Sequence, residues 1–373
     1  MKQGWEIKKL GEVCTIERGG SPRPIDAFLT DAEDGINWIK IGDATTGSKY
    51  ITATKEKIKP EGVKKSRMVY KGDFILSNSM SFGKPYILGI DGCIHDGWLV
   101  LRDSNNLFDK SFLYYYLGSP NIYREFKRLA VGGVVNNLNS ELVRGVNVVI
   151  PPLPEQEQIV AELDCLSGII EKKKQQLKEY DSLAQSIFYE MFGNPNLNEK
   201  KWMTKKISNI CENLDYKRIP ITAKNRISGS IPYYGASGIV DYVEDYIFDG
   251  TYLLVSEDGA NLLMRNTPIA FTIFGKTWVN NHAHVLSFTN YPIHIFVEYF
   301  LNLLDLSYIV RGCAQPKLTQ ASLNEIKVFD VPLVLQQEFA SKIEAIEKQK
   351  ELIKQSIAET ETLFNSRMDY YFN

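Results

Sequence analysis

Two stretches of the chain place apolar residues at alternating spacings of three and four. The first follows the proline-rich run at 151–154, and the second follows Pro332; neither contains another proline for a long stretch. This spacing predicts two long helices, each with a coiled-coil seam. The apolar seam positions are Ile159, Leu163, Leu166, Ile170, Leu177, Ala184, Ile187 and Met191 in the first helix, and Phe339, Ile343, Ile346, Ile353, Ile357 and Phe364 in the second.

Polar residues interrupt both seams. Lys173 and Tyr180 occupy seam positions in the first helix, and Lys350 and Thr360 do so in the second. The two lysines are interpreted either as residues that set the helix register or as contacts for a partner protein. Two helices of equal length can bury their apolar stripes on each other. A parallel pairing would place the two domains side by side, whereas an antiparallel pairing, which we expect, would place them at opposite ends with pseudo-two-fold symmetry. The alternative is a helical hairpin that packs on a globular core.

The segments between these helices mix strand-like and helical patterns. Runs such as 74–77, 98–101, 252–256 and 284–288 are rich in β-branched and aromatic residues and are bounded by Gly, Asp and Asn, which predicts strands. Aromatic helices are expected around 112–117 and 296–301. The expected fold is therefore α+β. The expected segments are a first α/β-mixed domain at 1–150, a central helical spacer at 151–196, a second domain at 197–330 and a C-terminal helical spacer at 331–373.

The whole pattern occurs twice. At an offset of 180 residues the two helical stretches align without a gap, and Gln156 matches Gln336. The repeat extends backwards with insertions, because the run that begins at Trp5 resembles the run that begins at Trp202. An internal repeat of this length predicts two domain-plus-helix units. Further matched pairs are Glu171 with Glu351, Lys174 with Lys354, Leu183 with Leu363, Phe192 with Phe372, Leu138 with Leu318 and Val146 with Ile326.

Composition narrows the class of protein only modestly. The 43 Lys and Arg residues nearly balance the 45 Asp and Glu residues, which argues against a protein that coats DNA in bulk but allows local DNA-reading patches. The five cysteines are scattered and suggest reduced thiols, hence a cytoplasmic protein without a zinc site or disulfides. No window is apolar enough to span a membrane, and the first residues do not resemble a signal peptide.

Loops in both domains carry the residue types that hold phosphates and read base edges: Ser, Asn, Gln, Lys, Arg and glycine-turn amides. Taken singly, each of these loops is better explained as an ordinary solvated turn. Their recurrence at matching places in the two copies favours a role in DNA binding. The candidate contacts are Arg18, Ser21, Arg23, Ser79, Ser81, Lys84, Asn136 and Asn137 in the first copy, and Lys224, Arg226, Tyr234, Ser237, Asn261, Asn281, His282, His284, Arg311, Gln315 and Lys317 in the second.

The run from Gly132 to Ile159, which includes Val149-Ile-Pro-Pro-Leu-Pro-Glu-Gln-Glu-Gln158, closely resembles the specificity subunits of type I restriction–modification systems. The lead-in at Trp5 and the close at 191–195 also resemble that family, so the resemblance covers the whole chain. The second copy departs from the pattern because Val331-Pro-Leu-Val-Leu-Gln336 lacks the Pro-Glu-Gln run. The helix register is unaffected by that change.

The resemblance implies a mechanism and a set of partners. Each target recognition domain would read one half of a split double-stranded DNA target, and the paired helices would set the gap between the halves. Methyltransferase subunits would bind beside the helices, and a restriction–translocase subunit would join them. Partner subunits would use S-adenosylmethionine, ATP and Mg²⁺, and this chain would need no cofactor or metal of its own. Basic patches at 64–71 and 200–206 would add DNA contacts or would serve only as solubilising surface.

No complete catalytic motif is evident. The run Phe274-Gly-Lys-Thr277 lacks the upstream glycine of a phosphate-binding loop. Glu325 and Lys327 form only half of a nuclease signature. His282 and His284 alternate on a predicted strand with no cysteine or carboxylate set nearby, so no metal site is expected. The two histidines are interpreted instead as lining a DNA-facing surface or packing locally. The chain is therefore predicted not to be an enzyme. The competing hypothesis is a coiled-coil scaffold with two protein-binding domains and no role on DNA.

Overall fold

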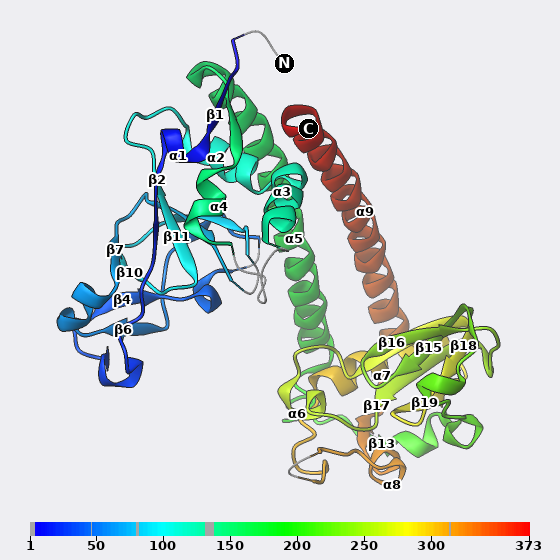
Figure 1. Cartoon of the computed structure of the whole chain (residues 1–373). Helices are drawn as coiled ribbons and strands as arrows, with labels where there is room; N and C mark the ends of the chain where they lie inside the picture. The colour runs from blue at the N-terminus through cyan, green and yellow to red at the C-terminus, as the bar shows by residue number, and fades with distance from the viewer. Residues whose placement is uncertain (1–3, 46, 80–81, 131–137, 313–314) are drawn as a thin grey trace. The chain divides into compact units, whose positions relative to one another are not determined.

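The protein is described here from a computed structural model, which covers residues 4–45, 47–79, 82–130, 138–312 and 315–373 (Figure 1). Its contacts divide the chain into two compact units. The first unit comprises Met1–Lys173 and Ser356–Asn373, and the second comprises Lys174–Gln355. Each long helix therefore contributes one half to each unit.

The first unit contains a domain built from short strands and helices. One of its sheets has the strand order β3-β6-β4-β10-β7, another has the order β2-β11-β8-β9-β5, and β1 pairs with β12. The strands are β1 (Glu6–Lys9), β2 (Thr15–Arg18), β3 (Leu29–Thr30), β4 (Ile36–Ile39), β5 (Tyr50–Ile51), β6 (Glu56–Ile58), β7 (Arg67–Val69), β8 (Phe74–Ser77), β9 (Pro85–Leu88), β10 (Gly92–Ile94), β11 (Trp98–Arg102) and β12 (Asn147–Ile150).

Strands β8, β9 and β11 read as continuous apolar runs because both of their faces are buried. One face packs on the core that contains the helices, and the other packs on a smaller core around Trp98. The helices of this unit besides the long pair are α1 (Leu10–Val13), α2 (Lys110–Leu117), α3 (Pro120–Ala130) and α4 (Ser140–Arg144), with 3₁₀ turns at Ile25–Ala27, Ile41–Asp43 and Pro60–Lys65.

The second unit contains a sheet with the strand order β14-β19-β17-β18-β15-β16 and a separate pair, β13-β20. The strands are β13 (Thr204–Lys206), β14 (Glu212–Asn213), β15 (Ser228–Gly235), β16 (Gly238–Val243), β17 (Phe248–Ser256), β18 (Ala270–Val279), β19 (Ala283–Ser287) and β20 (Lys327–Phe329). The helices besides the long pair are α6 (Asn261–Met264), α7 (Tyr291–Leu303) and α8 (Gln320–Asn324), with 3₁₀ turns at Ile207–Asn209, Asp215–Lys217 and Ala223–Asn225.

Matching residues of the two repeats make matching backbone and capping contacts. Asn139 caps α4 by accepting a hydrogen bond from the Leu142 N–H at 2.9 Å. Thr319, 180 residues later, caps α8 through the Ser322 N–H at 3.1 Å. Side-chain oxygens at this position satisfy an amide that the first helical turn leaves without a partner. The repeat seen in the sequence is therefore a repeat of local structure.

The two long helices are α5 (Leu153–Phe192) and α9 (Leu333–Phe372), and their bounds differ by the same 180 residues. Within the first unit, Glu162 of α5 accepts a hydrogen bond from Arg367 of α9 at 2.5 Å, whereas Lys173, further along α5, contacts Ser356, which comes earlier in α9. Within the second unit, Asp181 pairs with Lys350 at 2.7 Å. Contact positions rise in one helix as they fall in the other, so the helices run antiparallel, as expected.

The ends of the long helices pack on the domains as well as on each other, which the predicted seam did not indicate. Ile187 and Met191, which the heptad spacing places in the seam, are only half buried. Phe188 and Phe192 are completely buried instead, and their rings contact Phe296 of α7 and Phe339 of α9. A helix pair that also packs on a domain needs a wider apolar face than a free coiled coil does. The helices are therefore part of the hydrophobic core of each unit.

The predicted fold class is confirmed: two sheet-rich α+β domains occur in tandem with two long antiparallel helices. The predicted strands at 74–77, 98–101, 252–256 and 284–288 all fall within strands, apart from the last residue of the fourth run. Within the described part of the chain, no helix is both long and apolar enough to cross a membrane.

Candidate nucleic-acid interface

In the first unit, the loop after β2 and the loop after β8 meet the turn that precedes β11. The Gly19 N–H donates to the Trp98 carbonyl at 2.9 Å, and the Asn78 N–H donates to the Gly97 carbonyl, also at 2.9 Å. A Cβ atom at Gly19 would lie 2.2 Å from the His95 carbonyl oxygen, so only glycine allows this approach. Two loops predicted to bind DNA are thus fastened to one edge of the domain.

Three predicted DNA contacts converge on Asp96, which was not predicted. Ser21 Oγ donates to Asp96 Oδ1 at 2.7 Å, and Arg18 Nε donates to the Asp96 carbonyl at 2.9 Å. Guanidinium nitrogens of Arg18 and Arg23 lie 4.0 and 3.9 Å from Asp96 Oδ2. Asn78 Nδ2 also donates to the Asp96 carbonyl, at 3.0 Å. One carboxylate therefore organises the loop from Arg18 to Arg23.

The electrostatics of this cluster keep Asp96 ionised. The hydrogen bond from Ser21 lowers its pKa, and the nearby His95 and Arg18 lower it further against the opposing effect of partial burial. His95 is itself desolvated, which lowers its pKa, and its Nδ1 accepts a hydrogen bond from the Gly97 N–H at 2.6 Å. The side chain of Arg23 is 84% exposed. The cluster thus presents an exposed guanidinium, that of Arg23, beside the carboxylate of Asp96.

The remaining candidates of the first copy are less closely grouped. Ser79 is half buried beside Asn78, and Lys84 is exposed, with its backbone N–H bonded to Ser77 Oγ at 2.9 Å. Ser81, Asn136 and Asn137 lie outside the described residues. Leu138, which follows the last two, donates its N–H to the Asn78 carbonyl at 2.9 Å.

The second unit repeats the backbone hydrogen bonds that join the loops of the first unit. The Leu318 N–H donates to the Glu257 carbonyl, and the Glu257 N–H donates to the His282 carbonyl, both at 2.8 Å. Leu318 is the repeat counterpart of Leu138, so Glu257 takes the place of Asn78. The Asn280 N–H donates to the Tyr234 carbonyl at 3.1 Å, which adds a further loop. The predicted loops around 234–238, 257–261, 280–284 and 311–317 are therefore linked at one edge of the sheet.

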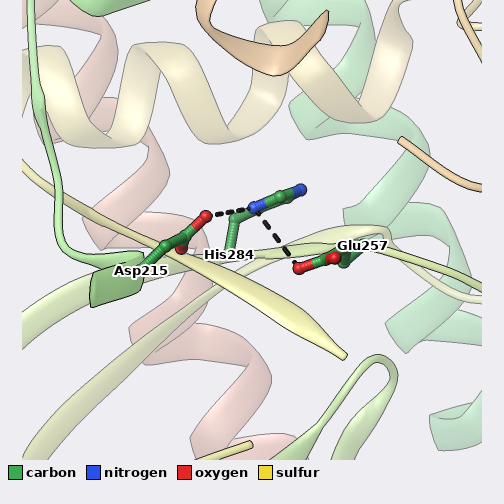
Figure 2. A group of neighbouring side chains, drawn as sticks. All are labelled: Asp215, Glu257 and His284. Carbon is green, nitrogen blue, oxygen red and sulfur yellow. Dashed lines mark hydrogen bonds and ion pairs between the residues drawn. The ribbon is translucent and has the colours of Figure 1, made fainter. Parts of the chain in front are cut away.

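His284 cannot be a DNA contact in this structure, which corrects that prediction. Its side chain is completely buried, and Figure 2 shows it between Asp215 and Glu257. Nδ1 lies 2.6 Å from Asp215 Oδ2, and Nε2 lies 2.8 Å from the Leu318 carbonyl oxygen. Each ring nitrogen therefore faces an oxygen atom, that of a carboxylate on one side and that of a backbone carbonyl on the other. His284 instead fastens the end of the 311–317 loop to the sheet.

The carboxylates around His284 also correct the statement that none adjoins the histidines. Asp215 and Glu257 come from other parts of the chain, and one carboxylate oxygen of each lies within 4.8 Å of a ring nitrogen of His284. Arg218 occupies the position between them, with guanidinium nitrogens 2.6 Å from Glu257 and 3.2 Å from Asp215. A metal ion would have to displace this guanidinium. The donor set is thus that of a charge-balanced ionic cluster rather than of a metal centre.

The same contacts explain the ionisation of the two carboxyl groups. Burial alone would raise the pKa of Asp215, but the hydrogen bond from His284 and the charges of His284 and Arg218 hold it below its ordinary value. The pKa of Glu257 is also lowered, because Arg218, His284 and Lys317 outweigh its burial. Lys317 Nζ lies 3.1 Å from Glu257 and remains half exposed. The ionic cluster thus reaches from the core to the surface of the loop.

Other candidates in the second copy divide into exposed and internally bonded residues. Arg226 donates to Asp241 at 3.0 Å and stacks on Tyr233, and both ends of the Asn261 amide bond the backbone of Thr267. His282 is 48% exposed, and its Nδ1 lies 2.8 Å from Asp258. Tyr234 is half buried, and burial raises its pKa. The exposed candidates besides His282 and Lys317 are Lys224, Ser237, Asn281, Arg311 and Gln315.

Lys173 and Lys350 are engaged within the helix pair. Lys173 Nζ donates to Ser356 Oγ at 2.6 Å and to Thr360 Oγ1 at 3.1 Å. Lys350 Nζ lies 2.7 Å from both Asp181 and Glu347, and its side chain is 15% exposed. These bonds favour the interpretation that the two lysines set the helix register. A role in binding a partner stays a prediction.

The residues that sequence reasoning missed are mainly acidic. Asp96, Asp215 and Glu257 hold the basic and hydroxyl groups of the candidate loops, yet a search for groups that attract phosphate passes over carboxylates. A local signal existed, because Asp96 adjoins His95 and Gly97 directly before a strand, and Glu257 begins the Glu-Asp-Gly turn directly after one.

Known proteins share both the sequence pattern and the fold. A family model described as the type I restriction modification DNA specificity domain matches residues 2–179 and again 199–362. A protein of Haemophilus influenzae named as a type I restriction enzyme specificity subunit is 34% identical over 148 residues, which cover 40% of this chain but only 37% of that protein. The chain therefore belongs to the family of type I restriction–modification DNA specificity proteins.

Other relatives extend over nearly the whole chain. The MjaX specificity subunit of Methanocaldococcus jannaschii is 22% identical over 95% of this chain and 91% of its own length. The solved S subunit of M. genitalium covers 99% of this chain and 96% of its own, with a TM-score of 0.57 and 14% identity. A chain from a structure concerned with the assembly of a type I system has a TM-score of 0.59, at 17% identity and 99% coverage of this chain. At these identities the solved structures establish the fold.

Proposed function

We propose that each recognition domain reads one half of a split double-stranded DNA target through the loops at its fastened edge. One observation carries this proposal: both repeats build the same loop junction. The Leu138 N–H bonds the Asn78 carbonyl in the first copy, and the Leu318 N–H bonds the Glu257 carbonyl in the second. The junction backbone is shared, whereas the side chains on it differ. Two copies of one scaffold with different surface groups suit the reading of two different sequences.

We further propose that α5 and α9 set the gap between the two half-sites. Each helix has 40 residues, which corresponds to roughly 60 Å at about 1.5 Å per residue. Lys173 and Lys350 bond across the seam, and these polar contacts favour one register over its neighbours. A fixed register gives a fixed length, as a spacer between two DNA-reading domains requires.

The same helices offer matching surfaces to partner subunits. Leu183 and Leu363, at equivalent positions in the repeat, are 46% and 49% exposed, and Leu153 and Leu333 are 44% and 52% exposed. Exposed apolar groups on matched faces suit two copies of one partner. The proposed partners are methyltransferase subunits that use S-adenosylmethionine and a restriction–translocase subunit that uses ATP and Mg²⁺. Catalysis is assigned to those subunits, and the assembly is proposed to act in the cytoplasm.

Binding of DNA by the assembled complex tests this function against the scaffold hypothesis. First, a genome-wide map of adenine methylation, with the gene intact and deleted, should reveal a split motif that depends on the gene. The chain with its methyltransferase partner should then bind a duplex carrying that motif, with an affinity that falls steeply as salt rises. No gene-dependent motif, together with no salt-dependent binding by the complex, would favour the scaffold.

A further inference from the structure

Within the first recognition domain, the side chains around Asp96 differ in how firmly they are held. Arg18 is bound at two points, since its Nε donates to the Asp96 carbonyl at 2.9 Å and its guanidinium lies 4.0 Å from the carboxylate. Arg23 has a single polar side-chain contact among the described residues, at 3.9 Å from Asp96 Oδ2, and is 84% exposed. The guanidinium of Arg23 is thus oriented from one side and open on the other.

The carboxylate itself is informative because it lies on a surface that would face DNA. Asp96 is 43% exposed, and the bond from Ser21 keeps it ionised. A carboxylate beside the DNA backbone would repel phosphates and cancel part of the attraction of Arg18 and Arg23. Near a base edge the same group is useful, because it orients a guanidinium and accepts a hydrogen bond from an amino group of a base. The Asp96 arrangement therefore suits the reading of a base better than the binding of a phosphate.

The base of this arrangement is rigid. Ser21 is held to Asp96, Asn78 is held to the Asp96 carbonyl, and the Gly20 N–H donates to the Ile94 carbonyl at 3.1 Å. Reading a base with two parallel hydrogen bonds requires such a platform, because the planar donor fork must meet both acceptors at once.

The second domain lacks this arrangement. Ser77 pairs with Trp98 in the first sheet, and its counterpart Ser256 pairs with Ala283 in the second. Counting back two residues, Asp96 therefore corresponds to Asn281, an exposed amide without the negative charge. Any role of the Asp96 arrangement must be confined to one half of a target.

We propose that Arg23 reads the guanine of a G·C pair in the half-site of the first domain, with Asp96 as the positioning residue that orients its guanidinium. This inference rests on the proposed function. The paired donors of the guanidinium match the O6 and N7 acceptors of guanine in the major groove. Arg18, anchored at two points, supports the same loop.

The test uses the chain assembled with its methyltransferase partner and a set of duplexes that vary one base pair at a time. In the R23A complex, we expect discrimination at one G·C position of the first half-site to fall about 10- to 100-fold, with the second half-site unchanged. R23K keeps the charge but lacks the fork, so it should lose discrimination to a similar degree. D96N should weaken discrimination at the same position, and less severely. R128A is the matched control, because Arg128 pairs with Glu125 on an exposed helix face of the same domain.

Several results would overturn the inference. A contact with phosphate predicts that R23A weakens binding to every sequence equally and lowers the salt dependence by about one charge, while R23K behaves like the wild type. Loss at the same position in R128A would show that the effect is not specific to Arg23. An intact second half-site shows in each case that the variant is folded. If the wild-type complex bound no split target at all, the proposed function would fail as well.

Discussion

Gln156 and Gln336, which are 180 residues apart, make the same buried hydrogen bond: each donates Nε2 at 2.8 Å to the carbonyl five residues before it. These acceptors belong to Pro151 and Val331, at the entry to the two long helices. The internal repeat of the sequence already aligns these two glutamines. Each glutamine therefore bonds the start of its long helix to the short segment that joins the helix to the preceding strand, and it does so in both repeats.

The two glutamines should nevertheless differ in their contribution to stability. Gln156 also donates to the Leu107 carbonyl at 2.9 Å and accepts from the Asp109 N–H at 2.8 Å, whereas the buried Oε1 of Gln336 has no hydrogen-bond partner among the described residues. Q156A should lower the free energy of unfolding by about 2 kcal/mol and Q336A by about 1 kcal/mol, because Q156A leaves more buried groups without partners. Denaturant unfolding of the two variants checks this order, and equal losses would contradict it.

The ruler role of the helices predicts the effect of lengthening them. Seven residues inserted after Lys173 and seven before Ser356 leave both contact units intact, because these residues mark the boundary between the units. A heptad nearly preserves the helix face and adds roughly 10 Å. The recognised gap should grow by about 3 bp with both half-site sequences unchanged.

A matched control variant carries the same insertion in α5 alone. It should lose target binding, because the seam bonds of Lys173 and Lys350 can no longer form in register. Unchanged spacing in the doubly lengthened chain would show that the helices do not set the gap.

The buried ionic cluster of the second domain predicts a non-additive pair of mutations. H284L removes a buried partner of Asp215 and should cost about 3 to 5 kcal/mol, because the carboxylate stays buried with less compensation. The residue at the matching position of the first sheet is Leu99, so leucine suits the fold there. H284L combined with D215N should be less destabilised than H284L alone. A double-mutant cycle by denaturant unfolding measures this, and simple additivity would contradict the coupling.

Opposing titrations in α7 predict an unusual response to pH. Burial raises the pKa of Glu298 to about 7 and lowers that of His294 to about 4, and both side chains bond Thr272 Oγ1. Between pH 4.5 and 7 the folded chain keeps a proton on Glu298 that the unfolded chain releases, so this group makes stability fall as pH rises. His294 has the opposite effect between pH 6.5 and 4, where only the unfolded chain is protonated.

Replacing Glu298 with glutamine removes one of these two effects. The free energy of unfolding of E298Q, relative to that of the wild type, should rise by about 1 to 2 kcal/mol from pH 5 to pH 8. Its stability should also fall more steeply than that of the wild type as pH drops from 6.5 to 4, since His294 then titrates without an opposing group. Unfolding midpoints at several pH values test this, and parallel curves for the two proteins would contradict it.

Sequence reasoning found the features that repeat and missed those formed by distant residues. The heptad spacing and the 180-residue offset predicted α5 and α9, because a helix stripe is visible in a local pattern. The pattern itself left both a parallel and an antiparallel pairing open, and the structure has the antiparallel one. The same pattern assigned Ile187 and Met191 to the seam, whereas Phe188 and Phe192 are the buried pair. The reason is that α7, more than one hundred residues away, packs on this end of the helix.

In the candidate interface too, local features could be predicted from the sequence and contacts between distant residues could not. The residue types of its loops were visible in the sequence, and the structure brings several of them together. The acidic groups that hold them were not apparent, because Asp96 lies 75 residues from Ser21 in the chain, and Asp215 lies 69 residues from His284. His284 looked like a surface residue because it sits at the end of a polar loop. Its burial follows from contacts with distant segments, namely the pairing of β19 with β17 and the bonds to Asp215 and Leu318.

The central claim is that each recognition domain reads its own half of the target. The most direct test replaces residues 1–150 with the corresponding domain of another family member and maps the methylated motif in the host. The account predicts that one half-site changes while the gap and the other half-site stay the same. A change in both half-sites, or in the gap, would contradict it.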